Sequence, residues 1–249
     1  QQLMVFNRVL RHNLRNQLNV GLGQAGRLRT GLGAPDSGPA TDDGASRSTD
    51  PSTERKPTGV RGTEARDGLE VIISATEDLL STAERAREFD RVYQQLHEIR
   101  PIEVRPIVEA VARQVRAAAP DATIEIEGIT PVLFSNRDAV RLILEELVDN
   151  AVKHAADSEP VVTISLRADT AGSLRLRIAD EGPGIPDQER QVIVEGDETQ
   201  LRHGSGIGLW VVKWLLTPIG GSLEISENEP TGPVVELVFP PSRWKHGGD

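Results

Sequence analysis

Cysteine is absent from the 249 residues, which excludes a disulfide framework and a thiolate metal site. Aromatic residues are also scarce, at 3% against 37% for hydrophobic residues, so the core must consist mainly of leucine, isoleucine, valine and alanine. No apolar run approaches the ~20 residues that a membrane span needs, and no secretory signal opens the chain. We therefore expect a cytoplasmic protein.

Lysine is rare as well, because arginine supplies every basic side chain except Lys56, Lys153, Lys213 and Lys245. The formal net charge is −10 at pH 7, which argues against a nucleic-acid partner because such a partner requires a basic face. An acidic, lysine-poor and arginine-rich composition is typical of a halophile. A GC-rich genome, which favours arginine codons, is the alternative explanation.

Helical periodicity dominates the first part of the chain. Residues 1–29 have one apolar face, formed by Leu3, Phe6, Leu10, Leu14 and Leu18. Residues 30–62 are rich in Gly, Pro, Ser, Thr and Asp, and they predict a disordered insertion. Helical periodicity resumes near Thr63, the expected N-cap, and continues to about Glu98. The pattern predicts an α-helical hairpin, which has too little core to be stable alone and is expected to form a homodimeric four-helix bundle.

Mixed helix and strand patterns follow an extended stretch between Pro101 and Pro106, so we divide the chain into domains of residues 1–98 and 99–249. We expect helices over 106–118, 137–154 and 206–216, and strands over 123–128, 131–136, 161–168, 173–180, 222–227 and 234–239. Strands with helices gathered on one side predict a two-layer α+β sandwich.

The sequence EELVDNAVKH (145–154) carries the first candidate site. Leu147 and Ala151 lie one helical turn apart on the expected buried side. A different face of the same helix carries four polar side chains: Glu146, Asn150, Lys153 and His154. Oxygen donors beside a cation suit a polyphosphate that carries Mg²⁺. An ordinary amphipathic helix with a polar outer face is the alternative.

Two glycine-rich segments follow. In DEGPGI (180–185), a carboxylate at a strand end beside two glycines can accept a hydrogen bond from a nucleobase amine, although a Gly-Pro turn is the alternative. In GSGIGL (204–209), alternating glycines open a helix, whose first N–H groups and dipole favour phosphate. The candidate residues are Asp180, Gly182, Gly184, Ile185, Gly204, Ser205, Gly206, Ile207, Gly208 and Leu209.

The order of these three segments resembles the N, G1 and G2 boxes of the ATPase superfamily shared by gyrase, Hsp90, MutL and histidine kinases. The resemblance covers roughly residues 100–240 and implies a Bergerat-type ATP-binding fold with ATP and Mg²⁺ as cofactors. It further implies that Asn150 binds Mg²⁺ and that Asp180 recognises adenine. The glycines of the second and third boxes are implied to shape the adenine pocket and the phosphate lid.

The segment RVLRHNLRNQLNV (8–20) resembles the H-box of sensor histidine kinases, especially its haloarchaeal form. At roughly 100° per residue, His12 lies about 180° from the apolar face, so its imidazole is expected to be an exposed nucleophile. A surface histidine without a role is the alternative. The resemblance implies ATP-dependent autophosphorylation of His12 and phosphotransfer to an aspartate of a response-regulator receiver domain. Asn16, one turn further on, is implied to orient water for a phosphatase activity.

Several features depart from the family pattern. Asn13 follows the acceptor where an acidic residue is common, the phenylalanine-centred box is not evident, and the lid is short. Glu146 is then the best-placed carboxylate for a general base, with a role as a second Mg²⁺ ligand as the alternative. An ATPase that drives a conformational clamp, or a scaffold that only binds nucleotide, are the rival functions. Because the chain begins with Gln1, we also expect that an upstream sensor or membrane anchor is missing.

Salt distinguishes the two explanations of the composition. If the acidic surface is a halophilic adaptation, self-repulsion destabilises the fold in dilute buffer and salt relieves it. We predict that molar potassium chloride raises the midpoint of thermal unfolding by about 5 °C or more, since 1 kcal/mol shifts it by ~2–4 °C at this size. Circular dichroism measures the midpoint, and an unchanged value would favour the GC-rich genome.

Overall fold

The computed structural model describes part of the chain, namely residue 15 and residues 18–28, 59–155, 159–184, 207–227 and 232–247. The chain divides into two compact units, Asn7–Ala86 and a unit formed by Gln1–Phe6 with Arg87–Asp249. The division falls inside helix α2 (Gly59–Gln94), so its final turns, 87–94, belong to the second unit. The domain boundary that we place between residues 98 and 99 remains a prediction.

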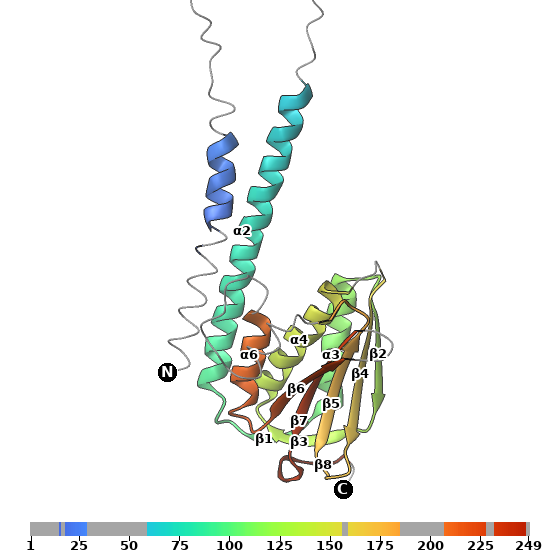
Figure 1. Cartoon of the computed structure of the whole chain (residues 1–249). Coiled ribbons are helices and arrows are strands. Elements are labelled where there is room, and N and C mark those ends of the chain that lie inside the picture. Colours follow the sequence, from blue (N-terminus) through green and yellow to red (C-terminus); the bar gives the residue numbers. More distant parts are fainter. Residues whose placement is uncertain are drawn as a thin grey trace, which may run out of the picture. The chain divides into compact units, whose positions relative to one another are not determined.

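In the first unit, the helical residues 18–28 pack beside α2 (Figure 1). Small side chains allow this approach, because a Cβ atom added at Gly21 would lie 3.6 Å from the Cβ atom of Ala75, and Gly68 lies against Leu28. Helix α2 already includes residues 59–62, which we expected in the insertion, so Thr63 lies inside the helix and the N-cap assignment is wrong. The rest of the predicted insertion lies outside the described residues.

The second unit is an α+β sandwich, as predicted. Its elements are β1 (Arg100–Glu103), α3 (Val104–Ala118), β2 (Thr123–Gly128), β3 (Pro131–Ser135), α4 (Arg137–Lys153), β4 (Val161–Ala168), β5 (Leu174–Asp180), α6 (Ile207–Leu216), β6 (Ser222–Glu227), β7 (Pro233–Phe239), η2 (Pro241–Arg243) and β8 (Trp244–His246). The predicted elements agree with these bounds to within two residues. None of the described helices combines the length and the apolarity that a membrane span requires.

The larger sheet has the strand order β2-β4-β5-β7-β6, in which β2 and β4 are parallel and the other pairs are antiparallel. Helices α3, α4 and α6 lie on one side of it (Figure 1). Alternation places apolar residues of β4 such as Ile164 against the helices. On the other side Arg175 forms ion pairs with Asp169, Glu224 and Glu236 at 3.1, 2.7 and 2.8 Å, so this face is charged.

A second sheet, in the order β1-β3-β8, was not predicted. The strands β1 and β8 have four and three residues, so neither shows a periodicity that identifies a strand. Pro101 lies in β1, which is an edge strand and therefore tolerates a residue without an N–H group. Trp244 of β8 donates its Nε1–H to the carbonyl oxygen of Gly172 at 3.0 Å, a contact between residues far apart in sequence.

Helix α4 is held at its N-terminus and along its buried face. Asn136 caps the helix, because its side-chain oxygen accepts a hydrogen bond from the backbone N–H of Ala139 at 2.9 Å. The Asn136 side chain also donates to the carbonyl oxygen of Gln95 at 2.8 Å. Ile143 and Leu144 are fully buried in the core. These contacts hold α4 in place in the core. Its C-terminal half carries the candidate site.

Candidate active site

Glu146 and Asn150 lie one turn apart on α4. The alternation of faces expected for this helix is confirmed, because Leu147 and Ala151 are buried in the core. Glu146 is also buried, with only 5% of its surface exposed. An ordinary amphipathic helix would expose this carboxylate to solvent, because burying a charge has a large energetic cost. Glu146 therefore does not lie on a polar outer face of α4.

The first turn of α6 packs directly onto these two side chains. A Cβ atom added at Gly208 would lie 2.7 Å from Oε2 of Glu146 and 3.0 Å from Nδ2 of Asn150. A side chain at this position would therefore require the ends of the Glu146 and Asn150 side chains to shift. The start of a helix also presents unsatisfied N–H groups and the positive end of its dipole. The contact thus brings a helix N-terminus next to a carboxylate and an amide.

Asp180 ends β5 and is 8% exposed. Its Oδ1 atom accepts a hydrogen bond from the backbone N–H of Gly182 at 2.8 Å. Burial raises the pKa of Asp180, while the Gly182 hydrogen bond and the charge of His154 act in the opposite direction. A carboxylate held in this way retains a second oxygen that can accept a hydrogen bond from a ligand.

Gly182 lies close to both the Asp180 carboxylate and the C-terminal end of α4. A Cβ atom added there would lie 2.7 Å from Oδ1 of Asp180 and 2.8 Å from the carbonyl oxygen of His154, the C-cap residue of α4. Gly184 has φ +91°, a left-handed conformation that favours glycine. All three motifs therefore have described residues gathered around the C-terminal half of α4.

Gly232 contributes to the site but was not among the predicted residues. It has φ +106°, and a Cβ atom there would overlap the carbonyl oxygen of Asp180. The backbone of the loop before β7 thus approaches the Asp180 backbone more closely than any side chain permits. Gly232 precedes Pro233. In a sequence, a Gly-Pro pair predicts only a turn, so this pair does not identify Gly232 as a site residue.

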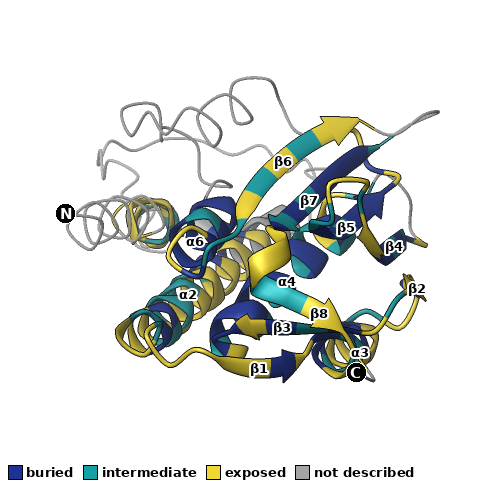
Figure 2. Cartoon of the chain, turned by 90° about the horizontal axis from the view of Figure 1, so that it is seen from below, coloured by how far each residue is buried: buried dark blue, intermediate teal, exposed yellow. Residues whose placement is uncertain are grey.

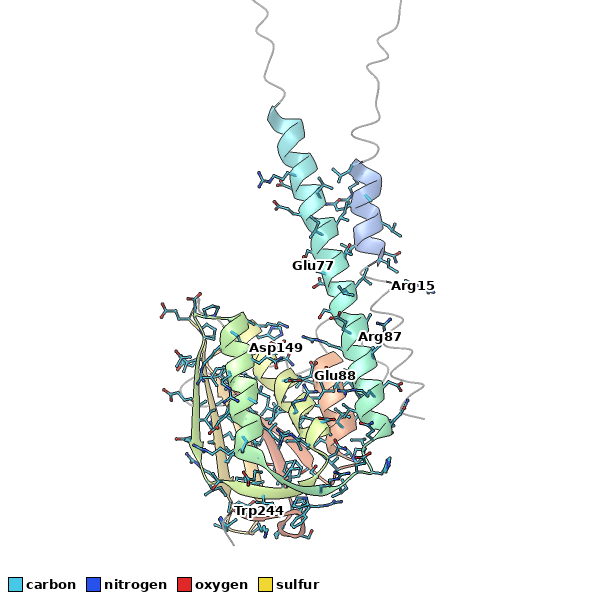
Figure 3. The ribbon with its side chains drawn as sticks, turned by 180° about the vertical axis from the view of Figure 1, so that it is seen from behind. Arg15, Glu77, Arg87, Glu88, Asp149 and Trp244 are labelled. Carbon is cyan, nitrogen blue, oxygen red and sulfur yellow. The ribbon has the colours of Figure 1, made fainter. Side chains whose placement is uncertain are left out.

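The predicted residues do not all meet at this point. Lys153 is exposed, and its Nζ atom forms an ion pair with Asp149 at 2.6 Å near the end of α4 (Figure 3). Ile207 begins α6, and Leu209 is buried in the same helical turn. The other predicted site residues lie outside the described part of the chain: His12, Asn16, Ile185, Gly204, Ser205 and Gly206.

The described residues offer few ligands for a divalent metal. Among the described residues no group of three or more His, Cys, Asp or Glu side chains is arranged to hold a metal ion. Glu146 and Asn150 offer one carboxylate and one amide oxygen side by side. This donor set fits Mg²⁺, which usually takes one or two protein oxygens together with substrate phosphates and water.

Residues 135–243 match the family described as histidine kinase-, DNA gyrase B-, and HSP90-like ATPase. The match includes α4, Asp180 and Gly208, so it contains the described parts of all three motifs. This segment is thus similar to the ATPase family that the resemblance to its boxes predicted.

The curated relatives carry more specific names. MprB of Mycolicibacterium smegmatis, a signal transduction histidine-protein kinase/phosphatase, is 27% identical over 153 residues, or 57% of this chain and 30% of MprB. The hybrid signal transduction protein dokA of Dictyostelium discoideum is 27% identical over 184 residues, or 67% of this chain and 11% of dokA. The chain therefore spans less than a third of the length of these relatives.

Solved structures share the fold. The mycobacterial sensor histidine kinase MprB has a TM-score of 0.50 and 26% identity, covering 57% of this chain and 97% of that chain. AdeS of Acinetobacter baumannii has a TM-score of 0.58 at 19% identity, covering 92% and 97%. ShkA full-length in complex with AMPPNP has a TM-score of 0.53 at 20% identity, covering 72% and 39%. The predicted resemblance to sensor histidine kinases is thus confirmed.

The raised pKa of Asp180 predicts a gain in stability when its charge is removed. An acid whose pKa is higher in the folded protein lowers the free energy of unfolding as the pH rises from its ordinary pKa to the raised one. The Asp180→Asn substitution keeps the shape of the side chain and removes the charge. We predict that this variant unfolds a few degrees above the wild type at neutral pH, since ~2–4 °C corresponds to 1 kcal/mol.

The same measurement in acid tests the cause. The difference should disappear below the ordinary pKa of aspartic acid, ~3.9, because both side chains are then neutral. Asp121→Asn, at an exposed position, is the matched control and should leave the midpoint of unfolding unchanged. A variant that is less stable than the wild type at neutral pH would contradict the burial argument.

Proposed function

We propose that the chain is the catalytic core of a sensor histidine kinase, a phosphotransferase that autophosphorylates His12 with ATP. The observation that carries the proposal is the contact of Gly208 with Glu146 and Asn150, which joins the start of α6 to the polar face of α4. The histidine kinases among the relatives support the same activity. The phosphoryl group then passes to an aspartate of a response-regulator receiver domain.

ATP is the proposed phosphoryl donor. Asp180 accepts a hydrogen bond from the adenine amine through the oxygen that Gly182 does not occupy. The first turn of α6 binds the phosphates through its N–H groups. The structure of ShkA, which has the same fold, contains AMPPNP, an analogue of ATP. Asn150 would hold Mg²⁺, which would neutralise charge on the phosphates, and a second Mg²⁺ ligand is the alternative role of Glu146.

The proposed reaction is an in-line transfer. A nitrogen atom of the His12 imidazole forms a bond to the γ-phosphorus of ATP while the bond between that phosphorus and the ADP oxygen breaks. The imidazole gives up its proton, and Glu146 is the proposed acceptor, since Asn13 has no basic group. Burial and contact with Gly208 hold the Glu146 carboxylate in place. Positioning and neutralisation of charge supply most of the catalysis of such a transfer.

A homodimer is the proposed assembly. The first unit exposes large apolar side chains that one protein chain leaves uncovered: Leu18, Val20, Leu22, Leu69, Ile73 and Leu80. An apolar helical pair is too small to be stable alone, and pairing two copies into a four-helix bundle buries these side chains. We further propose that Asn16 orients a water molecule that dephosphorylates the response-regulator partner. The name of the relative MprB includes such a phosphatase activity.

The two rival functions have less support. An ATPase clamp or a nucleotide-binding scaffold would contain the same site on α4, so the site alone does not separate them from a kinase. The names of the relatives favour the kinase. Phosphohistidine, which is labile in acid, would form only in a kinase.

Replacing the acceptor tests the proposed function directly. We predict that His12→Gln abolishes acid-labile phosphorylation by γ-labelled ATP while the Kd for ATP changes less than about threefold. The nucleotide affinity should persist because the described site residues all belong to the other compact unit. Asn13→Gln is a neighbouring control that should retain labelling. Label that persists at the original level in His12→Gln would show that another residue is the acceptor.

Replacing the buried carboxylate tests the base. Glu146→Gln keeps the size of the side chain and its contact with Gly208 but removes the basic group. We predict that the autophosphorylation rate falls by ~10²–10⁴, the usual contribution of general base catalysis, while the Kd for ATP with Mg²⁺ changes little. A collapse of this affinity would instead identify Glu146 as a metal ligand. Glu145→Gln, at the neighbouring position of α4, is the matched control.

A further inference from the structure

Asp180 lies at the point where β5 stops pairing with β7. The two strands lie side by side and are largely buried (Figure 2), and their pairing ends at Ala179 and Val234. Continuing the register by one residue would place Asp180 opposite Pro233, which has no backbone N–H group to donate. On its other side, Asp180 is still paired with Val162 of β4. The pairing of β7 therefore does not extend to Asp180, and the chain in front of β7 contacts it instead.

Gly232 makes this contact. Its φ is +106°, in the left-handed region that residues other than glycine rarely adopt. A Cβ atom at Gly232 would overlap the carbonyl oxygen of Asp180, and it would lie 2.8 Å from the Asp180 carbonyl carbon and 3.0 Å from Cα of Glu181. All three atoms belong to the backbone, so no rotation of a side chain relieves the overlap. A side chain at position 232 therefore has to displace either its own backbone or the peptide group between Asp180 and Glu181.

The Asp180 carboxylate is tied closely to this backbone. Alternation along β5 places the Asp180 side chain on the same face as Ile178, which is buried under the helices. The Oδ1 atom of Asp180 accepts a hydrogen bond from the backbone N–H of Gly182, two residues further on, at 2.8 Å. This hydrogen bond spans the peptide group that Gly232 contacts. A shift of that peptide group therefore moves the carboxylate and its donor together.

We propose that Gly232 is a positioning residue that sets the place of the Asp180 carboxylate and thereby the preference of the site for adenine over other purines. It acts through Asp180, because its contact is with the backbone of that residue. A hydrogen bond weakens steeply when its distance and angle depart from the favoured geometry, so a displaced carboxylate loses the adenine amine. This inference rests on the proposed function in that Asp180 accepts the hydrogen bond of that amine.

A pair of nucleotides isolates this one hydrogen bond. IDP carries a carbonyl oxygen where ADP carries the 6-amino group, so IDP cannot donate this hydrogen bond to a carboxylate, whereas its ribose and phosphates are the same. The ratio of the two Kd values therefore reports on the Asp180 carboxylate. Damage to the fold as a whole would weaken the binding of both nucleotides together and leave the ratio unchanged.

The test measures both Kd values by calorimetric titration of the full chain with Mg²⁺ present. We expect the wild type to prefer ADP by about tenfold or more, as a hydrogen bond to a charged group does, and Gly232→Ala to reduce this preference to below about threefold. In an Asp180→Ala background, Gly232→Ala should change the preference no further, because the carboxylate that it positions is absent. A wild-type preference in Gly232→Ala, or a further change in the double variant, would overturn the proposal.

Gly172→Ala is the matched control. Gly172 also has a positive φ, +81°, but a Cβ atom there would meet the Pro241 side chain at 3.5 Å, which is an ordinary contact. Both substitutions strain a left-handed residue and cost stability, but only the one at Gly232 presses on Asp180. We expect Gly172→Ala to keep the wild-type Kd for both nucleotides. A loss of the preference for ADP in this variant as well would assign the effect to strain in general and contradict the proposal.

Hydrogen exchange provides a readout that needs no variant. Coupling is reciprocal, so a nucleotide that fixes the Asp180 carboxylate must also stabilise the segment that contacts the Asp180 backbone. In the wild type, saturating ADP should slow amide exchange in residues 232–236, and saturating IDP should not. Exchange that ADP leaves unchanged would show that the segment does not position Asp180. If the wild type bound neither nucleotide, the proposed function itself would fail.

Discussion

The contact of Gly208 with Glu146 and Asn150 is the constraint on which the candidate site depends. It joins two helices that are far apart in the sequence, and a Cβ atom at Gly208 would require the ends of the Glu146 and Asn150 side chains to shift. Because of this contact, the first turn of α6 lies beside a buried carboxylate and an amide. Neither helix alone would bring a helix N-terminus next to the oxygen atoms of Glu146 and Asn150.

Two carboxylates of the candidate site are buried, and for Asp180 burial raises the pKa. Glu146 and Asp180 are 5% and 8% exposed, and burial disfavours the charged form of such groups. The Gly182 N–H group offsets part of this cost for Asp180. A fold selected for stability alone would not bury these side chains, so their presence is consistent with a role in binding and catalysis.

Helix α2 is continuous across the division between the two compact units. Its final turns are integrated into the core of the α+β unit through Phe89 and Val92, which are both almost fully buried. The division of the chain into two compact units thus lies inside a regular helix. Periodicity alone could not locate this division, because the helical pattern continues across it.

Features that depend on neighbours along the chain were predictable from the sequence. The periodicity of residues 137–153 identified α4 and its buried face, and alternation identified β4 and β5, because both patterns repeat within one element. The residue types of the three ATPase motifs likewise stand at fixed local spacings. Only the tertiary structure decided that Glu146 is buried beneath Gly208, that Gly232 lies against Asp180, and that Phe89 packs on Trp214. These contacts join distant segments, and no local pattern of side chains records which segments meet.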